Sequence, residues 1–348
     1  MSPTTMRAAR FDQSARQLTL TEVPVPDLLP HEVLVRVQAC GVCLSDIHLI
    51  DGSLPSNLPV VTPGHEPAGV IEAIGDAVPY WKPGQRVVMA AGRPCLACSS
   101  CAGGHPDACR AVQIMGFSFD GAWAEFVVVP FAALTLVPDG VPIEQAAILA
   151  DAVSTPYAAL LERAQVRPAE AVGIWGVGGL GIHAVKLARM LGAAPIVVLD
   201  PLDAARERGL RAGADIAIDP TAANAVQQVR AVTGGDGLDI ALDVVGSPLV
   251  LQQAEQCLAH TGRLVMVGMS LEPTTLGPGA LFSLQSQSLL GHLGYRKQHL
   301  DQLVRLVDLG RLDVSDSVSD VLPLDDIADA VDRLATKRGD PVRLVIRP

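Results

Sequence analysis

The spacing of hydrophobic residues changes about halfway along the 348-residue chain. Up to about residue 150, short apolar stretches are separated by prolines and glycines, and residues 32–37 and 85–89 give the clearest strand predictions. From about Val172, short apolar strands alternate with alanine-rich helices, which is typical of a doubly wound parallel sheet. Six strands are expected there, over residues 171–175, 196–200, 215–218, 238–244, 263–267 and 288–291.

The pattern of hydrophobic residues changes again near the end of the chain. After about Leu293 it becomes helical and charged, over residues 300–309 and 324–336, and it closes on a strand-like segment, 342–346. We therefore predict an α/β protein with two domains. Residues 1–153 and 293–348 would form a mostly antiparallel β domain, and residues 154–292 a doubly wound parallel-sheet domain.

Composition narrows the range of partners. Hydrophobic residues make up 49% and charged residues 18%, as in ordinary globular proteins, and the formal net charge is −11. Such a surface repels nucleic-acid phosphates and anionic lipid, so neither nucleic acid nor membrane is expected as a partner. The N-terminus lacks the apolar core of a signal peptide, and no run of about 18 apolar residues occurs. We expect a cytoplasmic protein, whose thiols stay reduced.

Four cysteines stand close together at Cys95, Cys98, Cys101 and Cys109, in a segment rich in small residues. Four thiolates at this spacing can surround one tetrahedral Zn²⁺, and all-cysteine sites without an open position are structural. Two alternatives remain at this point, a disulfide pair and an iron–sulfur cluster, although the usual cluster motif places its last two cysteines closer together. Reduced thiols favour zinc.

A glycine-rich G-x-G-x-x-G segment occupies residues 176–181. It follows a predicted strand and opens a predicted helix that ends near Gly192, which is the context of a dinucleotide-binding loop. Gly176 would permit the tight turn, Gly178 would let a pyrophosphate approach the backbone, and Gly181 would allow close packing of helix on strand. Gly179 and Leu180 complete the predicted phosphate-binding loop at the helix N-terminus.

The cofactor preference is read from the next strand, which ends in Asp200, 24 residues after Gly176. A carboxylate at this position accepts hydrogen bonds from ribose hydroxyls and repels a 2′-phosphate, so NAD is favoured over NADP. Alternatively, Asp200 only caps the following helix. Arg206 and Arg208 lie near enough in sequence to be candidate phosphate contacts.

Two further segments carry candidate metal ligands, residues 43–48 (C-L-S-D-I-H) and 64–66 (G-H-E). A lone cysteine or histidine is usually a core residue, so each segment by itself is weak evidence. Together with the cysteine lobe, the D-G-A-W-A-E segment at 120–125 and the glycine-rich loop, in this order, they make the chain resemble the zinc-dependent medium-chain alcohol dehydrogenase family over nearly its whole length.

This resemblance implies a fold and a set of roles. The first domain would be GroES-like and catalytic, the second a Rossmann domain, and the assembly a homodimer or homotetramer. Each subunit would hold two Zn²⁺ ions, one catalytic and one structural, and would act with NAD on a small alcohol or ketone. The implied roles are zinc ligation by Cys43 and His65, occasional ligation by Glu66, support of the ligands by Asp46, a proton relay through Ser45 and His48, pyrophosphate binding by Arg343, and approach to the nicotinamide by Val267 and Gly268.

The third ligand departs from the commonest family pattern. Aligned on Tyr157, the position where many members have cysteine holds Asp151. A carboxylate is a legitimate zinc ligand, and catalytic zinc normally has three protein ligands. Alternatively, Asp151 caps a helix running from Thr155 to about Ala164.

The substrate pocket is the least constrained part of the prediction. Ala90, Ala91 and Gly92 stand where many family members carry a bulky aromatic residue, which suggests room for a secondary alcohol. Leu54, Trp123 and Phe119 are expected to line the pocket. Two other functions compete: a polyol or sugar dehydrogenase on the same scaffold, and a zinc module that binds protein or nucleic acid, which the net charge disfavours.

Overall fold

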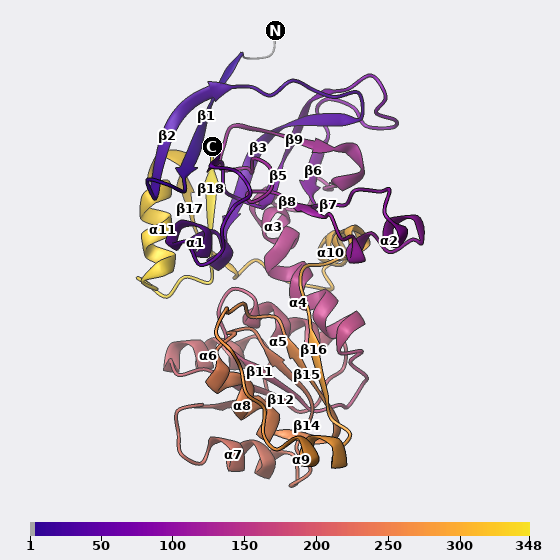
Figure 1. Cartoon of the computed structure of the whole chain (residues 1–348), viewed down its shortest axis with the longest axis vertical. Coiled ribbons are helices and arrows are strands. Elements are labelled where there is room, and N and C mark those ends of the chain that lie inside the picture. The colour runs from indigo at the N-terminus through magenta and orange to yellow at the C-terminus, as the bar shows by residue number, and fades with distance from the viewer. Residues whose placement is uncertain (1–3) are drawn as a thin grey trace. The chain divides into compact units, whose positions relative to one another are not determined.

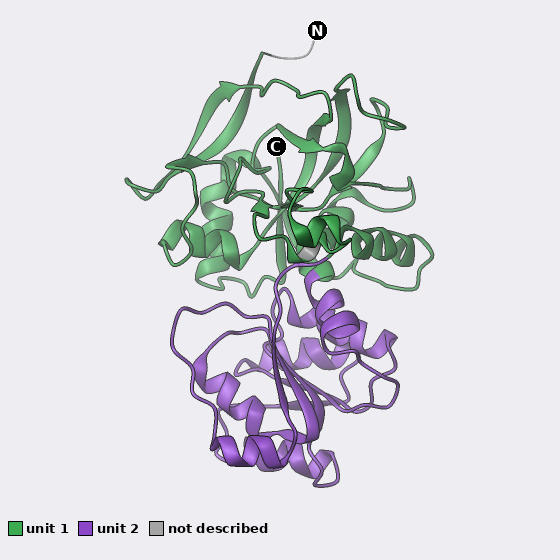
Figure 2. Cartoon of the chain, turned by 45° about the vertical axis from the view of Figure 1, so that its right-hand side comes forward, with its two compact units in different colours: residues 1–154, 296–348 green, residues 155–295 purple. Residues whose placement is uncertain are grey.

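The computed structural model describes residues 4–348 and divides into two compact units (Figure 2). Met1–Ser154 and Arg296–Pro348 form the first unit, and Thr155–Tyr295 forms the second. These boundaries lie one and three residues after those expected from the sequence. The fold class is confirmed, because an antiparallel unit precedes and follows a parallel one.

The first unit is built mainly from antiparallel strands (Figure 1). Within the described residues its largest sheet has seven strands, in the order β10-β6-β5-β3-β18-β17 with β9 paired to β3, and only β17 and β18 run parallel. Smaller sheets are β2-β1-β4 and β7-β8. The strands are β1 (Thr5–Asp12), β2 (Gln17–Pro24), β3 (Glu32–Val42), β4 (Val60–Val61), β5 (Glu66–Ile74), β6 (Arg86–Met89), β7 (Gly92–Arg93), β8 (Gln113–Ile114), β9 (Phe126–Pro130), β10 (Leu134–Leu136), β17 (Val318–Pro323) and β18 (Arg343–Arg347).

Helices of the first unit cover its sheets and include both predicted C-terminal ones. Apolar residues recur at helical spacing in α11, where Ile327, Ala330 and Leu334 are buried on one face. The helices are α1 (Leu44–Asp51), α2 (Ser99–Ala102), α3 (Ile143–Ile148), α10 (Lys297–Asp308) and α11 (Ile327–Ala335), with single turns η1 (Pro106–Ala108), η2 (Phe131–Ala133) and η5 (Leu324–Asp326) and a π-helical turn η3 (Leu149–Val153).

The second unit contains a parallel sheet, and all six predicted strands are present. Its order is β13-β12-β11-β14-β15-β16, so the direction of winding reverses between β11 and β14. The strands are β11 (Val172–Trp175), β12 (Ile196–Leu199), β13 (Ile216–Ile218), β14 (Leu238–Asp243), β15 (Leu258–Met266) and β16 (Ser288–Gly291). Strand β15 begins five residues before the prediction because Leu258 already pairs with Leu238, ahead of a register shift.

Helices enclose this parallel sheet, which explains why β11 and β12 are apolar and buried at every position. Trp175 packs in a core cluster of the unit with Val197, Leu199 and Leu264. The helices are α4 (Ser154–Ala158), continued by the π-helical turn η4 (Ala159–Arg163), α5 (Gly181–Met190), α6 (Asp203–Arg211), α7 (Ala225–Val232), α8 (Pro248–Gln256) and α9 (Gly279–Leu284). Across residues 4–348, no helix has the length and apolar character needed to span a bilayer.

Candidate functional site

Four side chains from three segments of the first unit converge on one point. Cys43 lies between β3 and α1, His65 and Glu66 stand at the beginning of β5, and Asp151 belongs to the π-helical turn η3. One donor atom from each of the four lies within 4.8 Å of every other. The structure therefore brings together the three residues that the sequence nominated as ligands and Glu66, which it nominated as an occasional one.

The spacing of these donor atoms fits a tetrahedral ion. The Sγ of Cys43 lies 3.3 Å from Oδ2 of Asp151, and Nε2 of His65 lies 3.6 Å from the same oxygen. Zinc–ligand distances of about 2.0–2.3 Å place neighbouring donors about 3.3–3.8 Å apart in a tetrahedron. One thiol, one imidazole and one carboxylate at this spacing can hold Zn²⁺.

Asp46 connects the segments that carry these donors. Its carboxylate is fully buried; Oδ2 accepts the N–H of Cys43 at 2.9 Å, and Oδ1 accepts the N–H of Gly64 at 3.2 Å. Oδ1 also lies 3.2 Å from Nδ1 of His65. Because Nδ1 then donates to a carboxylate, Nε2 is the nitrogen left to bind a metal.

Acidic side chains around His65 shift its protonation equilibrium. Burial alone would lower the pKa of His65, but the carboxylates of Asp46 and Asp151 outweigh burial and raise that pKa well above its usual value. Without a metal, the imidazole itself is driven to carry the positive charge that the surrounding acids require. A cation in the cluster satisfies the same acids.

Glu66 is also fully buried, and burial raises its pKa to about 8 although Arg343 opposes the shift. The guanidinium of Arg343 lies 3.1 Å from Oε1 of Glu66 and donates to the carbonyl of Val42 at 3.1 Å. Its side chain is only 3% exposed. The structure thus places Arg343 directly behind the cluster, and a contact with cofactor phosphates stays a prediction.

The two relay candidates lie on one face of α1, three residues apart. Oγ of Ser45 is 3.3 Å from Nε2 of His65, so this hydroxyl lies at the cluster. His48 is more accessible, with 35% of its side chain exposed and Nδ1 lying 3.6 Å from a carboxylate oxygen of Asp51. One group therefore faces the cluster and the other reaches solvent.

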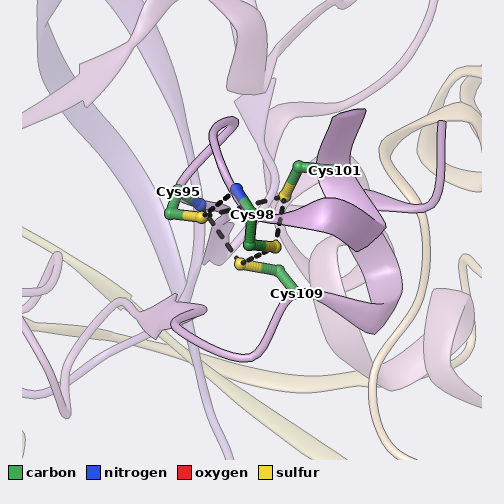
Figure 3. Close-up of side chains that lie close together, drawn as sticks. All are labelled: Cys95, Cys98, Cys101 and Cys109. Carbon is green, nitrogen blue, oxygen red and sulfur yellow. Dashed lines mark hydrogen bonds between the residues drawn. The ribbon is translucent and has the colours of Figure 1, made fainter. Parts of the chain in front are cut away.

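The four predicted cysteines of the lobe surround a second point (Figure 3). Sγ of Cys98 lies 3.5 Å from Sγ of Cys101 and 3.9 Å from Sγ of Cys109, and Sγ of Cys95 lies 4.0 Å from that of Cys101. Four sulfurs at about 2.3 Å from one zinc would be about 3.8 Å apart. All seven cysteines in the described residues are unpaired, so the disulfide alternative is not realised.

Backbone N–H groups of the lobe point at these sulfurs. The N–H of Cys98 donates to Sγ of Cys95, and the N–H of Cys95 to Sγ of Cys109, each at 3.3 Å. Hydrogen bonds from the N–H groups of Cys101 and Arg110 lower the pKa of Cys98 to about 6. The loop therefore favours the thiolates of Cys95 and Cys98, the form that binds metal, whereas desolvation and the contact with Cys98 raise the pKa of Cys101 to about 12.

The glycine-rich loop of the second unit has the geometry expected of its glycines. Gly176 adopts a left-handed conformation with φ of 90°. A Cβ on Gly181 would lie 1.8 Å from the carbonyl oxygen of Gly176, so only glycine lets the helix begin so close to the strand. A Cβ on Gly178 would meet nothing within 4 Å, which leaves that side of the loop open.

Asp200 ends β12 beside this loop and is 8% exposed. Its Oδ2 accepts the N–H of Val177 at 2.9 Å and its Oδ1 accepts the N–H of Leu202 at 3.0 Å. The interpretation of Asp200 as a helix cap is wrong, because α6 has Leu202 at its N-cap and no side-chain cap.

The predicted nicotinamide-side residues follow β15. The N–H groups of Val267 and Gly268 donate to the carbonyl of Asp243 at 2.8 and 2.9 Å. A Cβ on Gly268 would lie 2.2 Å from the backbone nitrogen of Gly246, so this backbone approach also needs glycine. The segment is thereby fixed at the carboxyl ends of β14 and β15.

Two of the expected pocket residues pack against other protein groups. Trp123 is fully buried, and Phe119 lies under the guanidinium of Arg93 at 4.3 Å, so a pocket role for either stays a prediction. The aromatic ring that does stand beside the cluster is Phe117, whose centroid is 6.0 Å from that of His65. Its position only three residues before the D-G-A-W-A-E segment was the available sequence signal.

Comparisons with known proteins extend over the whole chain. The profile of the family "Alcohol dehydrogenase GroES-like domain" matches residues 29–139, and that of "Zinc-binding dehydrogenase" matches residues 179–308. An alcohol dehydrogenase of Cupriavidus necator is 30% identical over 99% of each chain, and a sorbitol dehydrogenase of Bacillus subtilis is 28% identical over 99% of this chain and 98% of its own. The solved alcohol dehydrogenase TADH from Thermus sp. ATN1 has a TM-score of 0.91 at 30% identity, covering 98% of this chain and 99% of that one.

Proposed function

The chain belongs to the zinc-dependent medium-chain alcohol dehydrogenase family, and from that premise we propose that it transfers a hydride between a secondary alcohol and NAD, with the ketone as the oxidised product. The observation that carries the proposal is that the donor atoms of Cys43, His65 and Asp151 meet at one point. The carboxylate of Asp46 holds the ring of His65 there. No single one of these side chains would point to this chemistry.

Cys43, His65 and Asp151 are assigned as ligands of a catalytic Zn²⁺, with Glu66 as an occasional fourth. When bound, this ion supplies Lewis-acid chemistry that lowers the pKa of an alcohol hydroxyl. Three protein ligands leave one coordination position for substrate. Cys43 and Asp151 are both anionic when they bind metal, so their combined charge equals that of the two-cysteine set of other family members.

Ser45 is assigned as the first acceptor of the hydroxyl proton. Its Oγ lies at the cluster, 3.3 Å from Nε2 of His65. His48, one turn further along α1, exchanges the proton with water at its accessible imidazole. Asp46 holds the Cys43 and His65 segments together.

The cofactor is assigned to the second unit. The N–H groups of residues 178–180 would receive the pyrophosphate, Asp200 the adenosine ribose, and Val267 and Gly268 the nicotinamide. The carboxylate of Asp200 favours NAD over NADP, because a 2′-phosphate would meet a negative charge there. Arg343 remains a candidate phosphate contact on the resemblance alone.

The cysteine lobe is assigned a second, structural Zn²⁺. Cys95, Cys98, Cys101 and Cys109 supply four sulfurs and leave no position for substrate. This site would stabilise a segment that has little core of its own, since only Cys109 among the four is buried. Two zinc ions per subunit are expected.

A second candidate substrate class is a polyol or sugar. It is favoured by the full-length similarity to a protein named sorbitol dehydrogenase. The small residues Ala90, Ala91 and Gly92 fit either class by leaving space. The alternatives differ in chemistry: a polyol needs polar groups along the pocket, whereas Phe117 places an apolar ring beside His65.

Assembly and location are also proposals. Strand β16 is an edge of the parallel sheet, and Leu281 and Leu284 of α9, which precedes it, are 54% and 74% exposed. A second copy pairing along this edge would cover both, giving a homodimer or a homotetramer of two such pairs. Unpaired thiols throughout the described residues suit the cytoplasm.

The test is a substrate and cofactor panel run beside a metal count. Secondary alcohols, ketones, primary alcohols and sorbitol are assayed with NAD(H) and NADP(H), and zinc is measured per chain. We expect two zinc ions and the highest kcat/KM for a secondary alcohol with NAD. Asp151→Cys should keep the catalytic zinc and Asp151→Ala should lose it. Turnover confined to ethanol-sized primary alcohols would refute the roomy pocket, and full zinc content in Asp151→Ala would refute the ligand assignment.

A further inference from the structure

Three side chains from outside the glycine-rich loop hold its backbone. The N–H of Val177 donates to Asp200 at the end of β12, at 2.9 Å. The carbonyl of Val177 accepts from Nη2 of Arg208 on α6 at 2.8 Å and from its Nε at 3.2 Å. The carbonyl of Gly179 lies 2.7 Å from Nδ1 of His183 on α5, and because a carbonyl only accepts, that nitrogen is the donor.

These contacts also determine where the neighbouring N–H groups point. In a planar trans peptide the C=O of one residue and the N–H of the next are antiparallel. Drawing the Val177 carbonyl toward Arg208 therefore turns the N–H of Gly178 the other way, and drawing the Gly179 carbonyl toward His183 does the same for the N–H of Leu180. Within residues 4–348, the N–H groups of residues 178–180 donate to no protein acceptor.

The sequence alone predicts no contact of His183 or Arg208 with the backbone of the glycine-rich loop. His183 is fully buried, and Arg208 was a candidate only as a contact for a 2′-phosphate. In the structure the guanidinium of Arg208 faces the carbonyl of Val177. Arg206 is similarly occupied, because it donates to the carbonyl of Asp200 at 2.6 Å and pairs with Asp203.

We propose that Arg208 and His183 are positioning residues for dinucleotide binding: by holding the carbonyls of Val177 and Gly179, they aim the N–H groups of Gly178 and Leu180 at the pyrophosphate. This inference rests on the proposed NAD site. It concerns affinity for the diphosphate, since neither side chain touches the ligand. Because the guanidinium groups of Arg206 and Arg208 already bind backbone carbonyls, neither is expected to bind a 2′-phosphate.

The test is equilibrium binding to the purified full-length protein. NADH binding is followed by its fluorescence, and ADP-ribose and adenosine are measured by competition. Arg208→Met removes the guanidinium donors, and Arg211→Met is the matched control, since Arg211 lies on the same helix with 71% of its side chain exposed. His183→Phe removes the second donor and keeps a ring of similar shape. Arg208→Lys keeps the charge and one donor group.

We expect Arg208→Met to raise the Kd of NADH and of ADP-ribose about tenfold, the range of a charge-assisted hydrogen bond, and to change that of adenosine less than twofold. His183→Phe should act in the same direction more weakly, and Arg208→Lys should recover part of the loss. If Arg208→Met does not fold, the Lys and Phe variants carry the comparison.

Two results would overturn the inference. One is an NADH affinity of Arg208→Met equal to that of Arg211→Met. The other is an equal loss for adenosine and ADP-ribose, which would indicate a general disturbance of the unit. Failure of the unaltered protein to bind NADH would instead refute the proposed function, so the two failures are distinguishable.

Discussion

Replacing Asp46 by Asn tests how strongly the catalytic cluster depends on one buried carboxylate. Asp46 accepts the N–H groups of Cys43 and Gly64 and lies within hydrogen-bonding distance of Nδ1 of His65, and it has no exposed surface. An asparagine has nearly the same shape but only one oxygen. That oxygen can keep the contacts with Gly64 and His65. The NH2 group of the asparagine then faces the N–H of Cys43, and because both groups are donors, no hydrogen bond forms between them.

The magnitude follows from this one unmet contact. A buried donor left without an acceptor costs about 1–3 kcal/mol, so the free energy of unfolding of the metal-free protein should fall by about that amount. The ring of His65 also loses its anionic partner. Loss of such supporting contacts typically lowers metal affinity by about 10- to 100-fold, and the same range is expected here.

The assay is zinc retention during dialysis against a chelator, measured with denaturant unfolding of the stripped protein. Only one of the two zinc ions should become labile, because the cysteine lobe does not contact Asp46. Glu72→Gln is the matched control: Glu72 is a carboxylate on β5, in a partly exposed pair with Arg36 at 3.3 Å. Equal zinc retention in Asp46→Asn and Glu72→Gln would refute the reasoning.

Three further outcomes are expected. Cys98→Ser should release one zinc per chain and leave the other, which metal analysis of the purified variant checks. Asp200→Ala should raise the Kd of NADH and reduce the NAD-to-NADP ratio of kcat/KM by about tenfold, because the negative charge at the ribose is gone; an unchanged ratio would contradict that role. Burial raises the pKa of Asp243, so its contribution to stability is greatest below the unfolded-state pKa of about 3.9 and is lost as pH rises. Asp243→Asn should therefore gain melting temperature over the parent between pH 4 and pH 7, and a constant difference across that range would argue against a buried titrating acid.

Local patterns in the sequence predicted the second unit well. Strands β11 and β12 are buried on both faces, so they appear as unbroken apolar runs, and the glycines between β11 and α5 are required by contacts a few residues away. The start of β15 was predicted less accurately because its first residues pair with β14 before a bulge, which no local pattern reveals.

In the first unit, the spacing of residues in the sequence does not predict which way a side chain faces. Trp123 was expected to line the pocket. In the structure its indole fills the space beside Gly64, where a Cβ would come within 2.4 Å of the ring, and its Nε1 lies 3.5 Å from the carbonyl of Gly41. Whether an aromatic ring faces a pocket or the core depends on segments that meet only after folding. Residues 41 and 123 are 82 positions apart.

Acidic groups are concentrated in the catalytic cluster. Four acidic groups lie in or beside one small volume: Cys43, Asp46, Glu66 and Asp151. The guanidinium of Arg343 forms an ion pair with one of them, Glu66. Burial of several like charges is unfavourable unless they are paired, and the raised pKa of His65 and of Glu66, about 8 for the latter, is the response of the metal-free protein. A divalent cation would remove the need for both protonations. A carboxylate at position 151 carries the same charge as the thiolate that many family members have there. Asp151 therefore leaves the total charge of the ligand set unchanged and changes only the donor atom, from sulfur to oxygen.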